Sequence, residues 1–467
     1  MRDTSSPKTV AVVGGGLAGL AAACALADAG FRITLFERRP YLGGRASSYQ
    51  HPGTGEVVDN CQHVLLGCCT NLIAFYQRTG VADKIRWWDS LTFFEPGGRA
   101  SVIGSSPLPA PLHTSLSFLR ASCLSFVDKF SIARAMLSLM RSLPRDTGET
   151  FLDWLHRHGQ TPRAIERFWK TVLVSALNED LDRMSVSYAA QVFRESFLKS
   201  AAAGRMGVPT VPLTELYNAA GNYIRARNGD VQFRVPIDCF RPQESTVILT
   251  SGSQELFFDY AVIAVPFDGL ERMLPRASEA DSLRTMLARF EPSPITGIHL
   301  WFDRQITNLD HAVLLDRTIQ WMFHKSRLQE RGQKDGSYIE LVVSNSKWLV
   351  ERSRTEIIEL ALQELREFFP AAREAQLLKS TVIKEVHATY SPAPGVDAYR
   401  PGNVTAWPGV FLAGDWTNTG WPATMEGAVR SGYFAAQALA RAAGINGARY
   451  LVPDLPPTGL MRLFSRS

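Results

Sequence analysis

Runs of apolar residues with two different periods divide the chain into strands and helices. Near the N-terminus, residues 10–13 form a short, largely β-branched run that is typical of a buried parallel strand. The alanine-rich stretch 20–29 that follows is typical of a helix, and a second apolar run at 31–36 indicates another strand. This order of strand, helix and strand predicts a βαβ unit at the start of the chain.

The middle of the chain shows helical spacing. A proline-rich break at residues 107–111 precedes a tract, 116–143, in which apolar residues recur with the period of a helix and cover an unusually wide face. Two interpretations stay open: a pair of core helices buries this face, or the face forms a membrane patch or a substrate gate. Further helices are predicted at 151–158, 162–177, 184–200, 212–227 and 356–369.

Strand patterns return in the second half of the chain. Residues 233–237 and 260–266 are predicted to join the sheet of the first βαβ unit. Alternation of apolar and polar residues predicts half-exposed antiparallel strands at 296–302, 337–344 and 381–390. A last strand at 410–413 precedes a helix at 423–439.

Three glycines lie where the first strand meets its helix. Gly14, Gly16 and Gly19 have the G-x-G-x-x-G spacing. Gly14 would permit the tight turn, Gly16 would let the backbone approach a pyrophosphate, and Gly19 would let the helix pack against the strand. The start of the helix, at Leu17 and Ala18, would face the phosphates. The pattern therefore predicts a site for an adenine dinucleotide.

The residues after the second strand favour FAD over NAD. Glu37 lies about 20 residues beyond the glycines, where an acid binds ribose hydroxyls, and Arg38 follows it. Gly43, Gly44 and Arg45 then add a second glycine pair and a cation beside the phosphates. NAD enzymes do not usually need this addition, so we expect FAD as the cofactor.

The last strand and helix return the chain to this site. Gly414 and Asp415 end the strand at 410–413, and Asp415 would hydrogen-bond the ribityl or phosphate region, although an ordinary helix-cap role is the alternative. Thr424 and Met425 lie at the start of the next helix, whose N-terminal amides would face the N1/C2 carbonyl edge of a flavin.

Together these pieces resemble the glutathione-reductase-2 type of FAD domain shared by amine oxidases and phytoene desaturases. Within that group, segments 59–69 and 413–428 resemble the squalene-associated FAD enzymes known as hydroxysqualene dehydroxylases. Cys61 departs from that pattern, because a glycine is common at this position in the family. This departure leaves the backbone conformation there open and allows a thiol near the flavin.

The resemblance implies an α/β fold with a Rossmann domain for FAD and a second, α+β substrate domain made of an antiparallel sheet and helices. We expect the FAD-binding domain to comprise residues 1–95, 208–272 and 396–450. The substrate domain would have a helical part at 96–207 and a sheet part at 273–395, and a tail at 451–467 would be loose or would form a weak membrane foot.

The resemblance also indicates catalytic residues. In related folds the segment after Asp59 runs close to the flavin ring, so Gln62 and His63 are candidates, with His63 as a general acid kept protonated at neutral pH. Trp421 is the favoured aromatic wall, ahead of Trp416, Phe193 and Trp301. The residue that matches Val235 contacts the adenine through its backbone in related flavoproteins.

The implied reaction is reductive removal of the hydroxyl of hydroxysqualene, which gives squalene in hopanoid biosynthesis, with electrons from a donor that the sequence does not identify. A carotenoid-type desaturase or isomerase acting on a polyprenyl hydrocarbon is the first alternative. An amine oxidase is less favoured, because those enzymes commonly place a lysine on the strand that matches 293–302, where this chain has none. A non-catalytic flavin-binding assembly protein is the remaining alternative.

Composition narrows the partners. The net charge of +5 comes without Lys/Arg blocks, so we expect no nucleic-acid binding, and a basic surface facing anionic lipid is more plausible. The six cysteines show no paired C-x-x-C spacing and indicate reduced thiols, and no metal site is expected. No uncharged stretch is long enough to span a bilayer. We therefore expect a cytoplasmic protein, peripherally associated with the inner face of the membrane, with a disordered lead-in at residues 1–8.

Overall fold

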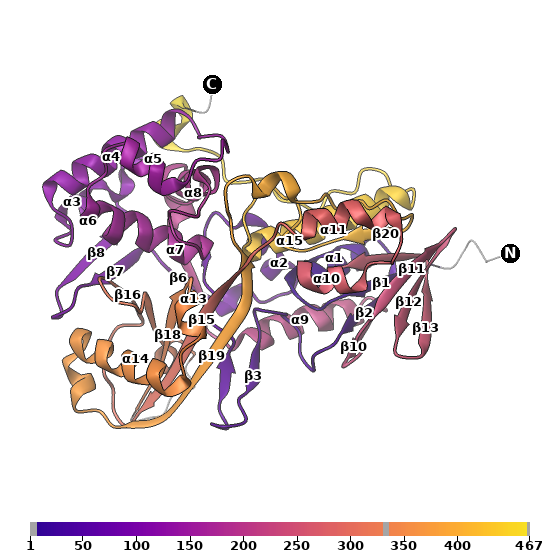
Figure 1. Ribbon diagram of the computed structural model, residues 1–467, viewed down its shortest axis with the longest axis horizontal. Coiled ribbons are helices and arrows are strands. Elements are labelled where there is room, and N and C mark those ends of the chain that lie inside the picture. Colours follow the sequence, from indigo (N-terminus) through magenta and orange to yellow (C-terminus); the bar gives the residue numbers. More distant parts are fainter. Residues whose placement is uncertain (1–6, 330–335, 465–467) are drawn as a thin grey trace.

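A five-stranded parallel sheet forms the centre of one half of the protein (Figure 1). The structure is a computed structural model that describes residues 7–329 and 336–464, so most of the predicted lead-in lies outside it. Strand order in this sheet is β10 (Asp230–Phe233), β2 (Arg32–Glu37), β1 (Thr9–Val13), β14 (Tyr260–Ile263) and β20 (Val410–Leu412). Because all five strands are parallel, their carboxyl ends lie at one edge of the sheet.

Four helices pack around this sheet and against one another: α1 (Leu17–Asp28), α2 (Thr70–Arg78), α9 (Leu213–Arg225) and α15 (Met425–Ala442). Helix α1 is buried along almost its whole length because it lies between α9 and α15. The two helices α1 and α15 approach very closely at Gly432, where a Cβ atom would lie 2.2 Å from the carbonyl oxygen of Ala18. The small residues of α1 are thus what the packing requires.

A seven-stranded sheet organises the second half. Its strand order is β19 (Leu377–Tyr390), β15 (Pro292–Phe302), β18 (Ser337–Ser344), β17 (Trp321–His324), β16 (His311–Leu314), β7 (Ser90–Phe94) and β8 (Ala100–Gly104). The long strands β15 and β19 run from this sheet toward the parallel-sheet half (Figure 1). Helix α14 (Arg354–Phe368) packs against the sheet and begins with a capping box between Ser353 and Glu356.

Short elements connect these layers. Hairpin β3 (Ser48–Gln50) and β4 (Val57–Asp59) precedes a small sheet of β5 (Leu65–Leu66), β9 (Met206–Pro209) and β6 (Ile85–Trp88). The three-stranded meander consists of β11 (Cys239–Gln243), β12 (Thr246–Ser251) and β13 (Gln254–Phe258). Four further helices are α10 (Phe267–Met273), α11 (Asp281–Leu287), α12 (Lys325–Leu328) and α13 (Lys347–Val350).

The tract at 116–143 forms two helices, as the interpretation of a helix pair predicted. The chain forms α3 (Ser115–Arg120) and α4 (Phe126–Arg141), and a capping box between Ser125 and Asp128 starts the second helix. One side of α4 is buried, but its other side leaves Phe126 77% and Phe130 66% exposed. Packing as core helices therefore accounts for only part of the wide apolar face.

Two predicted helices contain π-helical turns. The other helices of this part are η2 (Leu112–Thr114), α5 (Phe151–Arg157), α6 (Pro162–Ala164), η3 (Ile165–Lys170), α7 (Thr171–Leu177), α8 (Val186–Phe193), η4 (Arg194–Leu198) and η5 (Ala201–Gly204), of which η3 and η4 are π-helical. Such turns are rare and occur frequently at functional sites.

Three further predictions need correction. The strand predicted at 233–237 ends at Phe233, because Arg234 adopts a left-handed conformation with φ of 59°. Strand β7 belongs to the large sheet, although it falls within the segment 1–95 assigned to the FAD-binding domain. The tail is not loose over its described part, because η9 (Gly459–Leu463) buries Met461 and the Leu460 amide donates to the Ala110 carbonyl; the membrane foot stays a prediction. Within the described residues, no helix is both long and apolar enough to cross a bilayer.

Candidate active site

One cavity of about 720 Å³ collects residues from both ends of the chain. Of the residues predicted for the cofactor, only Gly19 is absent from its lining. Those that line it are Gly14, Gly16, Leu17, Ala18, Glu37, Arg38, Gly43, Gly44, Arg45, Val235, Gly414, Asp415, Thr424 and Met425. The catalytic candidates Gln62, His63 and Trp421 line the same cavity. Segments predicted separately from the sequence therefore meet at one place.

The glycine turn leaves open space where a phosphate would lie. Gly14 has φ of 108°, and a Cβ there would lie 2.5 Å from the carbonyl oxygen of Ala264. A Cβ at Gly19 would lie 2.0 Å from the carbonyl oxygen of Gly14, so the predicted roles of both glycines in the turn and the helix packing are confirmed. At Gly16 a Cβ would meet only Gly44, at 3.9 Å, and would project into the cavity instead. The cradle fits a pyrophosphate.

The Glu37 carboxylate ties the end of β2 to this turn. Its Oε2 atom accepts a hydrogen bond from the Gly15 amide at 2.8 Å, and its Oε1 atom accepts one from the Arg39 amide at 2.8 Å. Each carboxylate oxygen keeps a second lone pair. Because the side chain lines the cavity, these lone pairs suit the hydroxyl groups of a ribose, as predicted for this acid.

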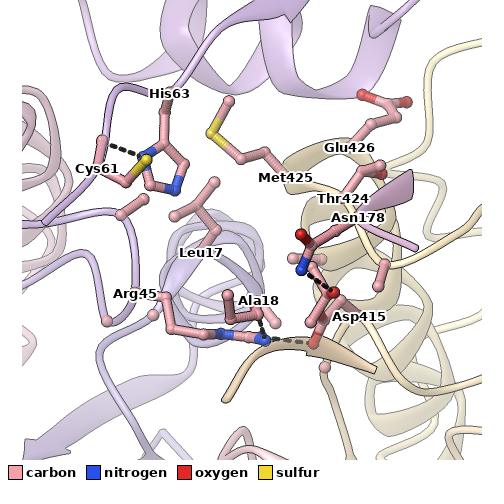
Figure 2. A pocket seen from close by; sticks show the side chains of 18 of the residues that line it. Leu17, Ala18, Arg45, Cys61, His63, Asn178, Asp415, Thr424, Met425 and Glu426 are labelled. Atoms are coloured by element: carbon pink, nitrogen blue, oxygen red, sulfur yellow. Dashed lines mark hydrogen bonds and ion pairs between the residues drawn. The ribbon is translucent and has the colours of Figure 1, made fainter. Parts of the chain in front are cut away.

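An ion pair joins the first and last segments of the cavity wall. The Nη2 atom of Arg45 lies 2.6 Å from Oδ1 of Asp415, and Nη1 donates to the carbonyl of Ala388 at 2.8 Å. Figure 2 shows this pair on the side of Leu17 opposite His63. Both charges are therefore held in place beside the glycine turn.

Helix α15 points its N-terminus at the cavity. Thr424 is the N-cap and its hydroxyl accepts from the Gly427 amide at 3.1 Å, while Met425 begins the helix. The unpaired amides of this first turn give the end of the helix a partial positive charge. This arrangement suits the electron-rich carbonyl edge of a flavin ring.

Sequence reasoning missed Glu426. This fully buried carboxylate lines the cavity, accepts from the backbone amides of Asn71 and Leu72, and pairs with Arg430 at 2.7 Å. It thereby binds the start of α2 to the start of α15. The sequence holds no signal for it, because a glutamate in a first helical turn is ordinary.

The loop after β4 presents His63 in a form that contradicts its predicted role. Its Nδ1 atom lies 2.7 Å from the Cys61 carbonyl, which can only accept, so Nδ1 carries the hydrogen and Nε2 is the bare nitrogen (Figure 2). Burial lowers the pKa of His63 below its ordinary value of 6.5. The imidazole is therefore neutral at pH 7, and it suits a proton acceptor better than the general acid that we expected.

Gln62 is held by groups other than a ligand. Its Oε1 atom accepts from Lys325 Nζ at 2.7 Å and its Nε2 atom donates to the His63 carbonyl at 3.0 Å. Both ends of the amide are thus engaged in fixing the loop, so a direct catalytic role for Gln62 stays a prediction without support from its contacts.

Beyond the dinucleotide cradle, the cavity continues between the two halves of the protein with apolar walls. Trp421 lines it, beneath the Arg430 guanidinium at 4.7 Å from the ring centre, whereas the other aromatic candidates, Trp416, Phe193 and Trp301, do not. Trp321 does line it and was missed, because its place follows from the sheet rather than from neighbouring residues. The apolar lining from the second half includes Leu91, Phe93, Val172, Ala176, Val192, Phe197, Met206, Ile295, Val313, Trp321 and Ala388.

All six cysteines are free thiols. Cys61 lines the cavity, and burial raises its pKa well above the ordinary value, so it stays protonated. Strand β15, where amine oxidases commonly carry a lysine, has none.

Comparisons with known proteins agree with this geometry. The chain matches the family of flavin containing amine oxidoreductases over residues 17–440. It is 27% identical to the 15-cis-phytoene desaturase of Synechococcus elongatus, covering 92% of this chain and 95% of that one. It is also 27% identical to the chloroplastic/chromoplastic 15-cis-phytoene desaturase of Solanum lycopersicum, covering 93% of this chain and 78% of that one. These relatives are carotenoid desaturases and not hydroxysqualene dehydroxylases, so they favour the first alternative.

Solved structures show the same fold. An oxidoreductase from Methanosarcina mazei has a TM-score of 0.71 at 18% identity, covering 91% of this chain and 98% of that one. The cyclohexylamine oxidase of Brevibacterium oxydans has a TM-score of 0.69 at 18% identity, covering 94% of this chain and 100% of that one. The expected α/β fold with a substrate domain is thereby confirmed. On the extent of the family match, the chain belongs to the flavin containing amine oxidoreductase family, and FAD is its cofactor.

Proposed function

We propose that the protein is an FAD-dependent oxidoreductase that acts on a long apolar isoprenoid, with desaturation of a polyprenyl hydrocarbon as its reaction. The observation that carries this proposal is the continuity of the dinucleotide cradle with an apolar extension walled by the substrate domain. A hydrocarbon chain offers no polar group to bind, so it requires such walls. The names of the two relatives, both phytoene desaturases, support the same substrate class.

In desaturation, FAD supplies a hydride acceptor while a proton leaves the neighbouring carbon. The residues of this chain provide the remaining requirements. The apolar walls hold the hydrocarbon and exclude water. Nε2 of His63 offers a lone pair to a proton inside the cavity, because Nδ1 is committed to the Cys61 carbonyl.

Reductive dehydroxylation of hydroxysqualene is the second candidate. It is supported by the resemblance of segments 59–69 and 413–428 to that group of enzymes. Loss of a hydroxyl as water needs a proton donor, and the neutral His63 is not one. This candidate therefore requires a different acid, and the electron donor that would reduce FAD is a partner still to be found.

One anaerobic experiment separates the two reactions. Protein loaded with oxidised FAD is mixed with 15-cis-phytoene, and protein loaded with reduced FAD is mixed with hydroxysqualene. Bleaching of the flavin with a product of longer conjugation supports desaturation. Recovery of flavin colour with formation of squalene supports dehydroxylation and contradicts the proposal that the protein is a desaturase. No change of colour with either substrate overturns both.

We also propose that α3 and α4 contact the surface of an anionic bilayer, which is where an isoprenoid hydrocarbon would reside. Helix α4 exposes Phe126, Val127 and Phe130 to solvent, and α3 exposes Leu116 and Leu119. Cationic side chains lie on the same two helices, at Arg120, Lys129, Arg134 and Arg141. Large apolar side chains flanked by cations favour attachment to anionic lipid. The proposal places the protein at the inner face of a cytoplasmic membrane.

A further inference from the structure

A buried lysine lies directly behind the loop that carries His63. Lys325 is the first residue of α12 and is 1% exposed. Its Nζ atom lies 2.5 Å from Oδ2 of Asp59, 2.7 Å from Oε1 of Gln62 and 3.3 Å from Oε2 of Glu340. Of these residues only Gln62 lines the cavity. The lysine thus reaches the active site through the loop and not by direct contact.

Such a site is costly unless its charges are paired. Burial alone would raise the pKa of the Asp59 carboxyl. The Lys325 ammonium outweighs this effect and holds the pKa below its ordinary value. Burial raises the pKa of Glu340 to about 7, in spite of the same ammonium. Lys325 and Asp59 therefore form the permanent ion pair, and removal of either partner leaves a buried charge alone.

The loop between β4 and β5 is held at Asn60, whose side chain donates to the Arg45 carbonyl at 3.0 Å and to Oε2 of Glu385 at 2.9 Å, and on either side of Asn60 it is held through Asp59 and Gln62. Asp59 ends β4, and its Oδ1 atom accepts from Ser48 Oγ at 2.6 Å and from the Leu213 amide at 3.1 Å. Past Asp59, the Gln62 side chain is bound by Lys325 on one side and by the His63 carbonyl on the other. Lys325 is thus the one group that holds both the start and the middle of this loop among the contacts described for it.

The shape of the loop fixes the state of His63. The bond from Nδ1 to the Cys61 carbonyl spans only two residues, so it persists only while the backbone from Cys61 to His63 keeps its turn. If the turn relaxes, Nδ1 loses its acceptor and the two neutral tautomers become comparable in energy. The imidazole would then no longer be held in the tautomer whose unprotonated Nε2 atom faces the cavity.

We propose that Lys325 is a positioning residue, which holds Asp59 and Gln62 from the substrate domain and thereby fixes the tautomer and direction of the His63 imidazole in the cavity. Helix α12 follows β17 of the large sheet, whereas β4 precedes the small sheet. The contact of Lys325 with Asp59 and Gln62 therefore also fixes the position of the loop relative to the large sheet. The role of His63 as a proton acceptor rests on the proposed function, whereas the role of Lys325 in fixing the imidazole does not.

The test measures the protonation of the two ring nitrogens of His63 directly. Holoprotein labelled with ¹⁵N-histidine is examined by NMR from about pH 6 to about pH 8, a range that brackets the ordinary histidine pKa. The protein has nine histidines, and the His63 signals are identified by their loss in His63→Gln. In the wild type, Nδ1 is expected to carry hydrogen and Nε2 to be bare throughout.

Two variants are compared with a matched control. Lys325→Met removes the ammonium. Gln62→Leu keeps the ion pair of Lys325 with Asp59 but removes the bond from Lys325 to the middle of the loop, together with the bond from Gln62 Nε2 to the His63 carbonyl. Both are expected to move the His63 signals toward the average of the two tautomers. Lys379→Met, which breaks the exposed pair with Glu56, is expected to leave them unchanged.

Coincidence of the His63 signals of the variants with those of the wild type overturns the proposal. If Lys325→Met does not fold, Gln62→Leu decides alone. The readout needs no substrate, so a failure of the proposed reaction and a failure of this inference are separately visible. Should turnover be established, both variants are expected to slow it, by on the order of 100-fold if the imidazole is misplaced by about 1 Å.

Discussion

Arg45 and Asp415 form an ion pair of 2.6 Å although 370 residues separate them in the chain. The pair closes the cofactor cavity between the segment after the second strand of the parallel sheet and the segment after its last strand. The pair therefore joins these two segments at the wall of the cavity, where the Ala388 carbonyl is a second acceptor for Arg45.

Loss of this pair is expected to weaken FAD binding while the protein still folds. Asp415→Asn removes the negative partner and one charge-assisted hydrogen bond, which corresponds to a roughly 10- to 100-fold higher Kd for FAD. Titration of the apoprotein with FAD, followed by flavin absorbance, measures the change. Glu56→Gln, which breaks an exposed ion pair, serves as the control. An unchanged Kd for Asp415→Asn would show that the ion pair does not contribute to FAD binding.

Two glycine variants are expected to separate cofactor binding from folding. Gly16→Ala projects its methyl group into the cavity, so the apoprotein should melt near the wild-type Tm and fail to retain FAD. Gly19→Ala places a methyl group 2.0 Å from a backbone carbonyl, so the apoprotein itself should be destabilised by about 1–3 kcal/mol or more. Thermal unfolding without FAD and binding of FAD are the paired measurements. Equal melting temperatures for both variants contradict this assignment.

Glu340 predicts an unusual dependence of stability on pH. Burial disfavours the charged form of its carboxyl and raises its pKa in the folded protein from an ordinary 4.5 to about 7. The titratable groups that surround it are Lys325, Asp59, His299 and Cys61. The free energy that it contributes to folding is therefore full below 4.5 and is lost as the pH rises through 7.

Glu340→Gln keeps a neutral side chain at every pH. Its stability relative to the wild type should therefore rise between about pH 5 and about pH 8, by an amount on the order of 3 kcal/mol. Urea unfolding at a series of pH values gives the difference. A relative stability that is constant with pH argues against a titrating Glu340.

His63 predicts the direction of the pH profile of the reaction. As a proton acceptor whose pKa lies below 6.5, it should support a constant rate at neutral pH and lose it on acidification. His63→Gln should lower the rate of flavin reduction by about 100-fold or more. Anaerobic rapid mixing at several pH values provides the measurement. A rate that increases on acidification would instead assign an acid to this position and favour dehydroxylation.

The exposed face of α4 should bind vesicles. The double variant Phe126→Ser with Phe130→Ser is expected to lose sedimentation with vesicles that contain anionic lipid, because it removes two large apolar side chains from the surface. Phe257→Ser, at a 57% exposed position on β13, controls for loss of an exposed aromatic ring elsewhere. Equal sedimentation of all three proteins would contradict the membrane proposal.

Local patterns predicted the cofactor cradle well, because its physics is local. Gly14 needs a turn that only glycine adopts easily, and Glu37 lies at a fixed distance along the chain, so spacing alone identifies both. The position of Asp415 followed from the strand that precedes it. These residues depend on their neighbours in sequence.

The residues that sequence reasoning missed depend on distant elements. Lys325 is an isolated lysine after a short strand, and only the folded sheet places it beside Asp59. Trp321 lines the cavity through the register of β17 with β18. The state of His63 was predicted wrongly for the same reason, since its desolvation and its bond to Cys61 exist only after folding.

The parallel sheet takes its fifth strand, β20, and the covering helix α15 from the far end of the chain. During synthesis on the ribosome, α1 therefore emerges long before the partner that buries it at Gly432. Until then its alanine face is open to chaperones and to aggregation. Capture of FAD must accordingly be one of the last events in the making of this protein.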